Sequence, residues 1–181
     1  HGALDARPEP EAFETARPDL SRRLSLAHPV SGLPLREALL ARMNADQVGV
    51  LGAIAFADFE RLSAFDVGLA ERAFAVSTGR LRRMLPADRF AAQVDRGHIG
   101  LWIGGVDEAA VRTELDAIGY ALGEAIEIDG QQIEPQIKIR AARFDASGGM
   151  EAGVFLARTL ASFALPTDAI GAPQKPVADY A

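Results

Sequence analysis

The clearest pattern in the chain is one long run of apolar residues between polar positions. Residues 47–56 (QVGVLGAIAF) are apolar and partly β-branched apart from the first, and Asn44 and Asp58 bound the run. This composition and length favour a buried central strand over a helix. Pro34 stands at a favoured first helical position, so we expect residues 35–43 to form a helix that leads into the strand.

Three later segments have apolar residues at the spacing of an amphipathic helix. The first covers residues 69–85 and is ended by Pro86, the second starts at Asp107, and the third covers residues 150–165. The positions expected to face a core are Ala70, Phe74, Ser77, Leu81 and Met84 in the first, Val111, Leu115, Ile118 and Leu122 in the second, and Val154, Leu156, Leu160 and Phe163 in the third.

Short strand patterns lie between these helices. Residues 90–94 and 99–103 are apolar runs that predict a β-hairpin, with Gly97 supplying the positive φ of a tight turn. Residues 129–130 (Asp-Gly) mark a second turn. Apolar and polar positions then alternate over residues 133–143, which predicts one more strand with a wetter face.

The order of these elements predicts an α+β domain in which helices pack on hairpin-linked strands. We place that domain at residues 28–165. Residues 1–27 are expected to be a helical connector, with Asp19 capping a short helix through Leu26. Residues 166–181 contain three prolines and no periodicity, which is typical of a linker or tail.

Composition narrows the classes of function. The 181-residue chain has no cysteine, which excludes disulfides and thiolate metal sites, and its net charge of −6 argues against sequence-independent nucleic-acid binding. No apolar run is long enough to span a bilayer and no signal peptide opens the chain, so we expect a cytoplasmic location without membrane contact. Because the chain starts with His1 rather than Met, we expect it to be part of a longer polypeptide.

A short motif connects this pattern to a known family. Residues 28–36 (HPVSGLPLR) resemble the D-x-L-T-G-L-P-N-R opening of GGDEF domains, the domains of bacterial diguanylate cyclases, and keep the Gly-Leu-Pro and Arg36. The strand, long helix and hairpin follow at the family's spacing, and the resemblance covers residues 28–165. It implies a nucleotidyl-cyclase-like fold with a mostly antiparallel central sheet flanked by helices.

The same alignment shows that the residues typical of cyclases are replaced. In the family, the first strand leads into D-x-D-x-F-K-x-x-N-D-x-x-G-H-x-x-G-D. Aligned on Phe59, Ala55 stands at the first metal carboxylate, and Ser63 and Arg72 stand where Asn and Asp usually recognise guanine. The resemblance therefore implies that the guanine contacts and one metal ligand are missing.

The hairpin signature is replaced as well. The five residues at the place of Gly-Gly-Asp/Glu-Glu-Phe are Asp95, Arg96, Gly97, His98 and Ile99. Gly97 takes the place of the second metal carboxylate. Residues 86–89 replace the inhibitory R-x-x-D of active cyclases, which implies that this product-binding site is also missing.

These replacements predict a domain without cyclase activity and without a cofactor. Magnesium prefers carboxylate and phosphate oxygens, and neither Ala55 nor Gly97 has a side-chain oxygen. Joining two GTP molecules depends on metal-assisted positioning and charge stabilisation, so turnover should fall close to background. The residues left for a residual nucleotide or partner contact are Arg36, Ser63, Arg72 and Arg158.

Several residues admit both a functional and an ordinary interpretation. His98 is either a base or metal ligand or a solvent-facing turn residue. Trp102 is either a packed sheet residue or a platform for base stacking. The acids Asp58, Glu60 and Asp66 are either a relocated metal site or solvated acids at helix starts, and the arginines Arg80, Arg82 and Arg83 are either an anion site or a basic helix C-terminus.

The resemblance leads to two hypotheses about function. The first is a non-catalytic regulatory or scaffold domain of a cyclic di-GMP signalling protein, in a longer chain with an EAL phosphodiesterase or another output domain. Its partners would be a second copy of the chain or the EAL domain. The alternative is a sensor whose pocket binds GTP, or cyclic di-GMP, and regulates the attached phosphodiesterase.

Overall fold

The computed structural model describes residues 22–105 and 107–165. The predicted connector helix from Asp19 falls partly outside these residues, and the predicted linker 166–181 lies wholly outside them. The elements in chain order are α2 (Arg36–Asp46), β1 (Val48–Phe56), α3 (Phe59–Phe65), α4 (Val67–Met84), β2 (Phe90–Asp95), β3 (His98–Gly104), α5 (Glu108–Leu122), β4 (Ile126–Ile128), β5 (Gln131–Ile133), β6 (Ile137–Asp145), η2 (Ala146–Gly148), α6 (Ala152–Ala161) and η3 (Ser162–Ala164).

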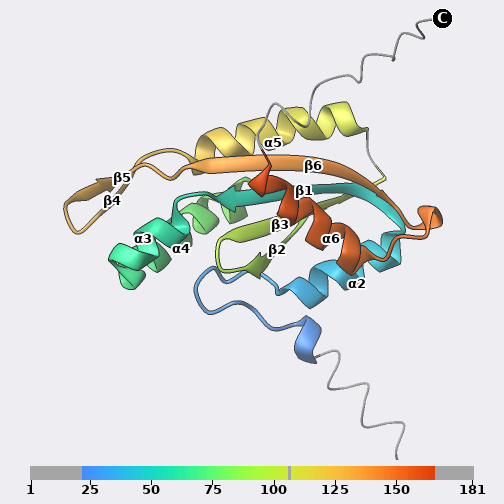
Figure 1. The fold of residues 1–181 in the computed structure, drawn as a ribbon, viewed down its shortest axis with the longest axis horizontal. Helices are drawn as coiled ribbons and strands as arrows, with labels where there is room; N and C mark the ends of the chain where they lie inside the picture. The colour runs from blue at the N-terminus through green and yellow to red at the C-terminus, as the bar shows by residue number, and fades with distance from the viewer. Residues whose placement is uncertain (1–21, 106, 166–181) are drawn as a thin grey trace, which may run out of the picture.

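The centre of the fold is a four-stranded antiparallel sheet in the order β2-β3-β1-β6. Strand β1 lies in the middle and is buried over nearly its whole length, as the apolar run predicts. Strands β4 and β5 form a separate two-stranded hairpin that projects beyond one end of the sheet (Figure 1). The predicted α+β fold with a mostly antiparallel sheet is confirmed.

Helices cover both faces of the sheet. On one face, α4 and α5 pack on β1 and β3, with Phe74 and Leu115 in the core. On the other face, α2 and α6 surround Trp102, which is 1% exposed and donates its indole N–H to Asp46 at 2.8 Å. Trp102 is therefore a packed sheet residue, and its ring is not accessible for stacking with a base.

The helix patterns are largely confirmed, with differences at the ends. Pro34 is not the first helical residue, because its carbonyl accepts a hydrogen bond from the Gln93 N–H at 2.9 Å and the helix begins only at Arg36. Met84 and Val154 were predicted to face the core, yet they are 42% and 44% exposed. In α6 the buried positions are Ala152, Leu156 and Thr159, and Val154 lies two residues out of that step.

The first hairpin forms as predicted, but its turn works differently. Gly97 does not take a left-handed φ. Instead, the Asp95 carboxylate accepts a hydrogen bond from the Gly97 N–H at 3.1 Å, and β2 has an irregular register between Gln93 and Asp95. The Asp95 side chain therefore stabilises the turn, which was predicted to depend on a positive φ at Gly97.

The second strand prediction needs correction. Residues 133–143 do not form one strand, since β5 ends at Ile133 and β6 begins at Ile137. Pro135 lies between them, and proline has no N–H with which to continue a ladder. The predicted turn at residues 129–130 is confirmed, with φ of 52° at Asp129 and 76° at Gly130. Helix α3 was not among the predicted elements.

Candidate functional site

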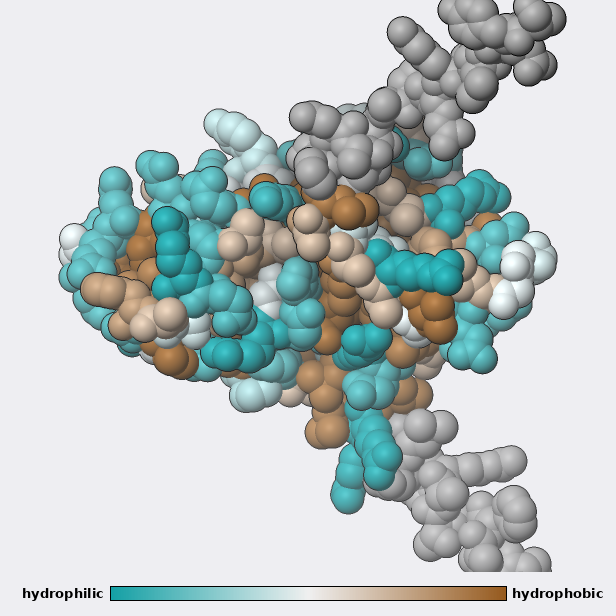
Figure 2. Space-filling model, in the orientation of Figure 1, coloured by the Kyte–Doolittle hydropathy of each residue, from teal (hydrophilic) through white to brown (hydrophobic). Residues whose placement is uncertain are grey.

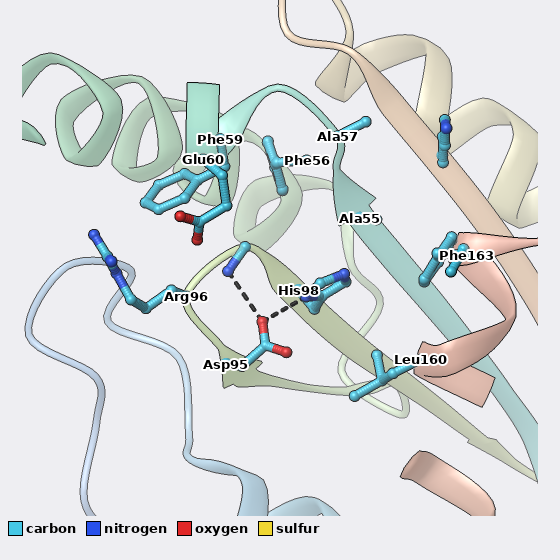
Figure 3. A pocket seen from close by; sticks show the side chains of 13 residues that line it. Ala55, Phe56, Ala57, Phe59, Glu60, Asp95, Arg96, His98, Leu160 and Phe163 are labelled. Atoms are coloured by element: carbon cyan, nitrogen blue, oxygen red, sulfur yellow. Dashed lines mark hydrogen bonds and ion pairs between the residues drawn. The ribbon is translucent and has the colours of Figure 1, made fainter. Parts of the chain in front are cut away.

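A cleft of about 640 Å³ opens at the end of the sheet where β1, the β2–β3 turn and η3 meet. Its floor contains Ala55 and Gly97, and Figure 3 shows Asp95, His98, Glu60 and Phe163 around it. On this side of the molecule, hydrophobic side chains lie over the middle and hydrophilic ones over both ends (Figure 2). The structure thus brings together, in one cleft, residues from the two segments that align with cyclase motifs, 55–60 and 95–98.

Strand register arranges four of these residues in a row. Ala55 pairs with His98 on one side and with Lys138 on the other, and His98 pairs with Asp95. Directly opposed residues in antiparallel strands point to the same face. The row therefore runs Asp95, His98, Ala55, Lys138 along the floor, and its centre has only a methyl group.

The acid and the imidazole of this row are already engaged with each other. Asp95 Oδ1 lies 2.5 Å from His98 Nδ1 and also accepts the Gly97 N–H (Figure 3). The His98 ring lies 5.6 Å from the ring of Phe163, between centroids. His98 is half-buried rather than solvent-facing, because the turn after α6 packs against it.

Arg96 connects the turn to α3. Its guanidinium donates to Ser63 Oγ at 3.0 Å and lies 5.6 Å from the centre of the Phe59 ring. Ser63, predicted as a residual nucleotide contact, is 7% exposed. The Ser63 hydroxyl, at the position that aligns with a guanine contact of the family, therefore already accepts a hydrogen bond within the protein.

Three other predicted contacts lie away from this hollow. Among the described residues, those lining the cleft do not include Arg36, Arg72 or Arg158. Arg72 donates to Asp129 at 3.0 Å, which joins α4 to the β4–β5 turn. Arg158 is exposed on α6, and Arg36 is half-buried in the first turn of α2.

The structure adds Lys138 and Phe163, which the sequence analysis did not assign to a site. Lys138 was only a polar position of an alternating strand, and its place beside Ala55 depends on the β1–β6 register. Phe163 was expected on the core face of the last helix. It lies instead in η3, where it lines the cleft and has the Arg140 guanidinium 5.4 Å from its ring centre.

The acids near the start of α3 are accounted for individually. Asp66 caps α4 by accepting from the Leu69 N–H at 3.0 Å, and Asp58 accepts from the Gln136 N–H at 3.2 Å. Only Glu60 of this group lines the cleft. Within residues 22–105 and 107–165, no three Asp, Glu, His or Cys side chains are grouped so that they could bind a metal ion.

Comparison with known proteins rests on structure. No protein-family profile matches the chain, and no curated protein has a matching sequence. Among solved structures, the diguanylate cyclase SiaD of Pseudomonas aeruginosa, crystallised with its activator SiaC, superposes with a TM-score of 0.71 and 14% identity over 84% of this chain. The chain spans 63% of that SiaD chain.

Two further structures extend the match. The FimX GGDEF domain of Pseudomonas aeruginosa superposes with a TM-score of 0.66 and 17% identity, covering 75% of this chain and 89% of that one. The chain has the GGDEF-domain fold. The S helix-GGDEF-EAL structure of Vibrio cholerae LapD, bound to c-di-GMP, gives a TM-score of 0.63 and 12% identity over 84% of this GGDEF-fold chain and 37% of LapD.

The cleft of this GGDEF fold does not suit the pair of magnesium ions that cyclase chemistry uses. Among the residues that the structure describes, two carboxylates line it, Glu60 and Asp95, and Asp95 is bound to His98 and to the turn backbone. Lys138 places a cationic side chain on the same floor.

In the described part of the chain no helix is long and apolar enough to cross a membrane.

Proposed function

We propose that this GGDEF-fold chain is a non-catalytic regulatory or scaffold domain of a cyclic di-GMP signalling protein. It acts within a longer chain that contains an EAL or another output domain, and its surface makes contact with that domain or with a second copy. The fold supports the signalling context, and solved structures of this fold include a GGDEF-EAL protein.

One observation carries the non-catalytic part of the proposal. Ala55 and Gly97, the positions that match the family's two metal carboxylates, both line the cleft and offer no side-chain oxygen. The centre of the floor has the methyl group of Ala55, and Lys138 beside it adds a positive charge. This donor set disfavours a divalent cation.

The expected loss of rate is large. Removal of one preorganised electrostatic stabiliser costs roughly 3–4 kcal/mol in other enzymes. Two such losses are not additive, yet each alone reduces the rate by a factor of about a hundred to a thousand. Turnover of GTP should therefore be close to the uncatalysed level.

The test is a product assay with purified chain, GTP and Mg²⁺, in which cyclic di-GMP is measured by chromatography. An active GGDEF-domain cyclase serves as the positive control, and the same chain without Mg²⁺ gives the background. Product at the background rate agrees with the proposal. Steady production of cyclic di-GMP by the wild-type chain refutes it.

A second function, a GTP-sensing domain, is favoured by the cleft itself. Its volume of about 640 Å³ lies in the range of small-molecule sites, and its lining includes the ring of Phe163 and the cationic side chains of Arg96 and Lys138. Aromatic and cationic groups suit a base and a phosphate without a metal.

Calorimetry with GTP, GDP and cyclic di-GMP separates the two functions. Micromolar binding that weakens at least about tenfold in Lys138→Gln, and stays unchanged in the control Arg83→Gln at the end of α4, supports the sensor. An absence of heat for all three nucleotides supports the scaffold.

A further inference from the structure

The outer strand of the sheet presents a free edge. β6 pairs with β1 on one side and ends the sheet on the other. The bonds that flank this pairing, Ala57 N–H to Gln136 O at 2.8 Å and Ala146 N–H to Gln47 O at 2.9 Å, fix which residues face β1. In an antiparallel ladder, the backbone groups of Ile137, Ile139, Ala141 and Arg143 then point outward.

These outward groups are nearly free of partners within the described chain. One hydrogen bond reaches them, from the Arg140 guanidinium to the Ile139 carbonyl at 3.1 Å. Exposed strand edges with unpaired N–H and C=O groups are templates for another strand. The β6 edge therefore has a backbone surface to which an extended segment can pair.

Helix α5 lies beside β6 (Figure 1), and residues of both elements line a groove along this edge. Its first part, about 240 Å³, is lined by Leu115, Ile139 and Ala141 together with the charged residues Arg112, Asp116 and Arg140. Its second part, about 360 Å³, is lined by Gly119, Tyr120, Gly123 and Ile137 together with Glu124. Tyr120 stands at the rim and is 80% exposed. One face of an added strand would therefore meet apolar side chains of β6 and α5 that lie between charged ones.

The other face of the same edge is cationic. Lys138 and Arg140 alternate with the isoleucines and point to the α6 side. Within residues 22–105 and 107–165 neither has an acidic partner, and the buried Nε of Arg140 has no acceptor. The chain as a whole has a net charge of −6, so this basic edge contrasts with the rest of the molecule.

We propose that the β6 edge binds an extended acidic peptide segment of another protein by antiparallel strand addition. Its apolar residues face the α5 groove, and its alternating carboxylates face Lys138 and Arg140. A second copy of β6 is disfavoured, because Arg140 lies near the middle of the strand and self-pairing would oppose cations. The backbone pairing does not involve the cleft, whereas Lys138 also lines the cleft, so a nucleotide bound there would compete for this one side chain.

The test uses a blocked peptide of about eight residues in which Glu and Val alternate, N-methylated on every Glu so that only its valine amides can pair with β6. The isomer N-methylated on every Val is the matched control. In an NMR titration of the full chain, the first peptide should shift and protect the amides of Ile137, Ile139, Ala141 and Arg143. The control isomer should bind at least about tenfold more weakly.

Protein variants test the two faces separately. Ala141→Pro removes an outward N–H, and the double change Lys138→Glu with Arg140→Glu reverses the charge; each should weaken the peptide at least about tenfold. Arg83→Glu is the charge control and should change affinity less than about twofold. Circular dichroism verifies that each variant is folded.

Four outcomes overturn the proposal. They are equal binding of the two isomers, shifts only outside β6 and α5, self-association of the chain that Ala141→Pro abolishes, and peptide binding that appears only after deletion of residues 166–181. The third result identifies a second copy as the occupant, and the fourth identifies the chain's own C-terminal segment.

Discussion

At the scale of single residues, close packing around Gly49 leaves no space for a side chain at this position. A Cβ at this position would lie 2.6 Å from the carbonyl oxygen of Ile103 and would also overlap the indole of Trp102. The carbonyl belongs to β3, which is paired with β1, and the indole is fully buried. Neither group can move without disturbing the core.

Gly49→Ala should therefore lower the free energy of unfolding by about 1–3 kcal/mol, the usual cost of overpacking a core. Urea denaturation followed by circular dichroism measures the change. Gly148→Ala is the control, because no atom lies within 4 Å of a Cβ placed there and its φ is not left-handed. Equal stability of the two variants would contradict the packing described for β1 and β3.

Individual residues also show what sequence alone could predict about the site. Ala55, Gly97 and His98 were expected to replace cyclase residues at matching positions, and they do meet in one cleft. Lys138 was not foreseen, because its place beside Ala55 follows from pairing between strands more than 80 residues apart. The hydrogen bond between Arg96 and Ser63 likewise depends on a long-range contact.

At the scale of elements, one arginine ties the long helix to the small hairpin. Arg80 of α4 donates to the carbonyl oxygens of Glu124 at 2.7 Å and Ala125 at 3.0 Å, just before β4 begins. The sequence suggested a basic helix end or an anion site for Arg80, Arg82 and Arg83. For Arg80 the acceptors are backbone carbonyls, so its side chain connects α4 to the segment that leads into the β4–β5 hairpin.

Arg80→Met should loosen the β4–β5 hairpin while it leaves the central sheet intact. Hydrogen bonds from a charged donor contribute roughly 1.5–3 kcal/mol each, and this change removes two of them. Hydrogen exchange at the amides of Ile126 and Ile128 should become faster, with β1 unchanged. Arg83→Met, on the same helix, is the control, and faster exchange in both variants would mean that the helix itself is destabilised.

Elements with strong periodicity were predictable, and interruptions were not. The run of β1 and the alternating steps of four and three residues in α4 and α5 were read correctly except at Met84, because burial of one face imposes them. The break between β5 and β6 was missed, since alternation continues across Pro135 even though the backbone ladder does not. Short segments such as α3 have too few turns to show a period.

At the scale of the whole molecule, the GGDEF fold surrounds a cleft in which Ala55 and Gly97 offer no side-chain oxygen. The antiparallel sheet and its helices agree with solved GGDEF domains at 14–17% identity, so packing patterns rather than site residues preserve the architecture. The floor of the cleft at the end of the sheet combines a methyl group, a lysine and a paired aspartate and histidine.

The most direct test of this account is a crystal structure of the chain grown with GTP and Mn²⁺, using the anomalous signal of manganese to locate bound ions. An active GGDEF-domain cyclase crystallised in the same solution is the control. We predict no manganese peak between Ala55 and Gly97, whether or not the nucleotide is present. A manganese ion at coordination distance from a triphosphate in that position would contradict the account.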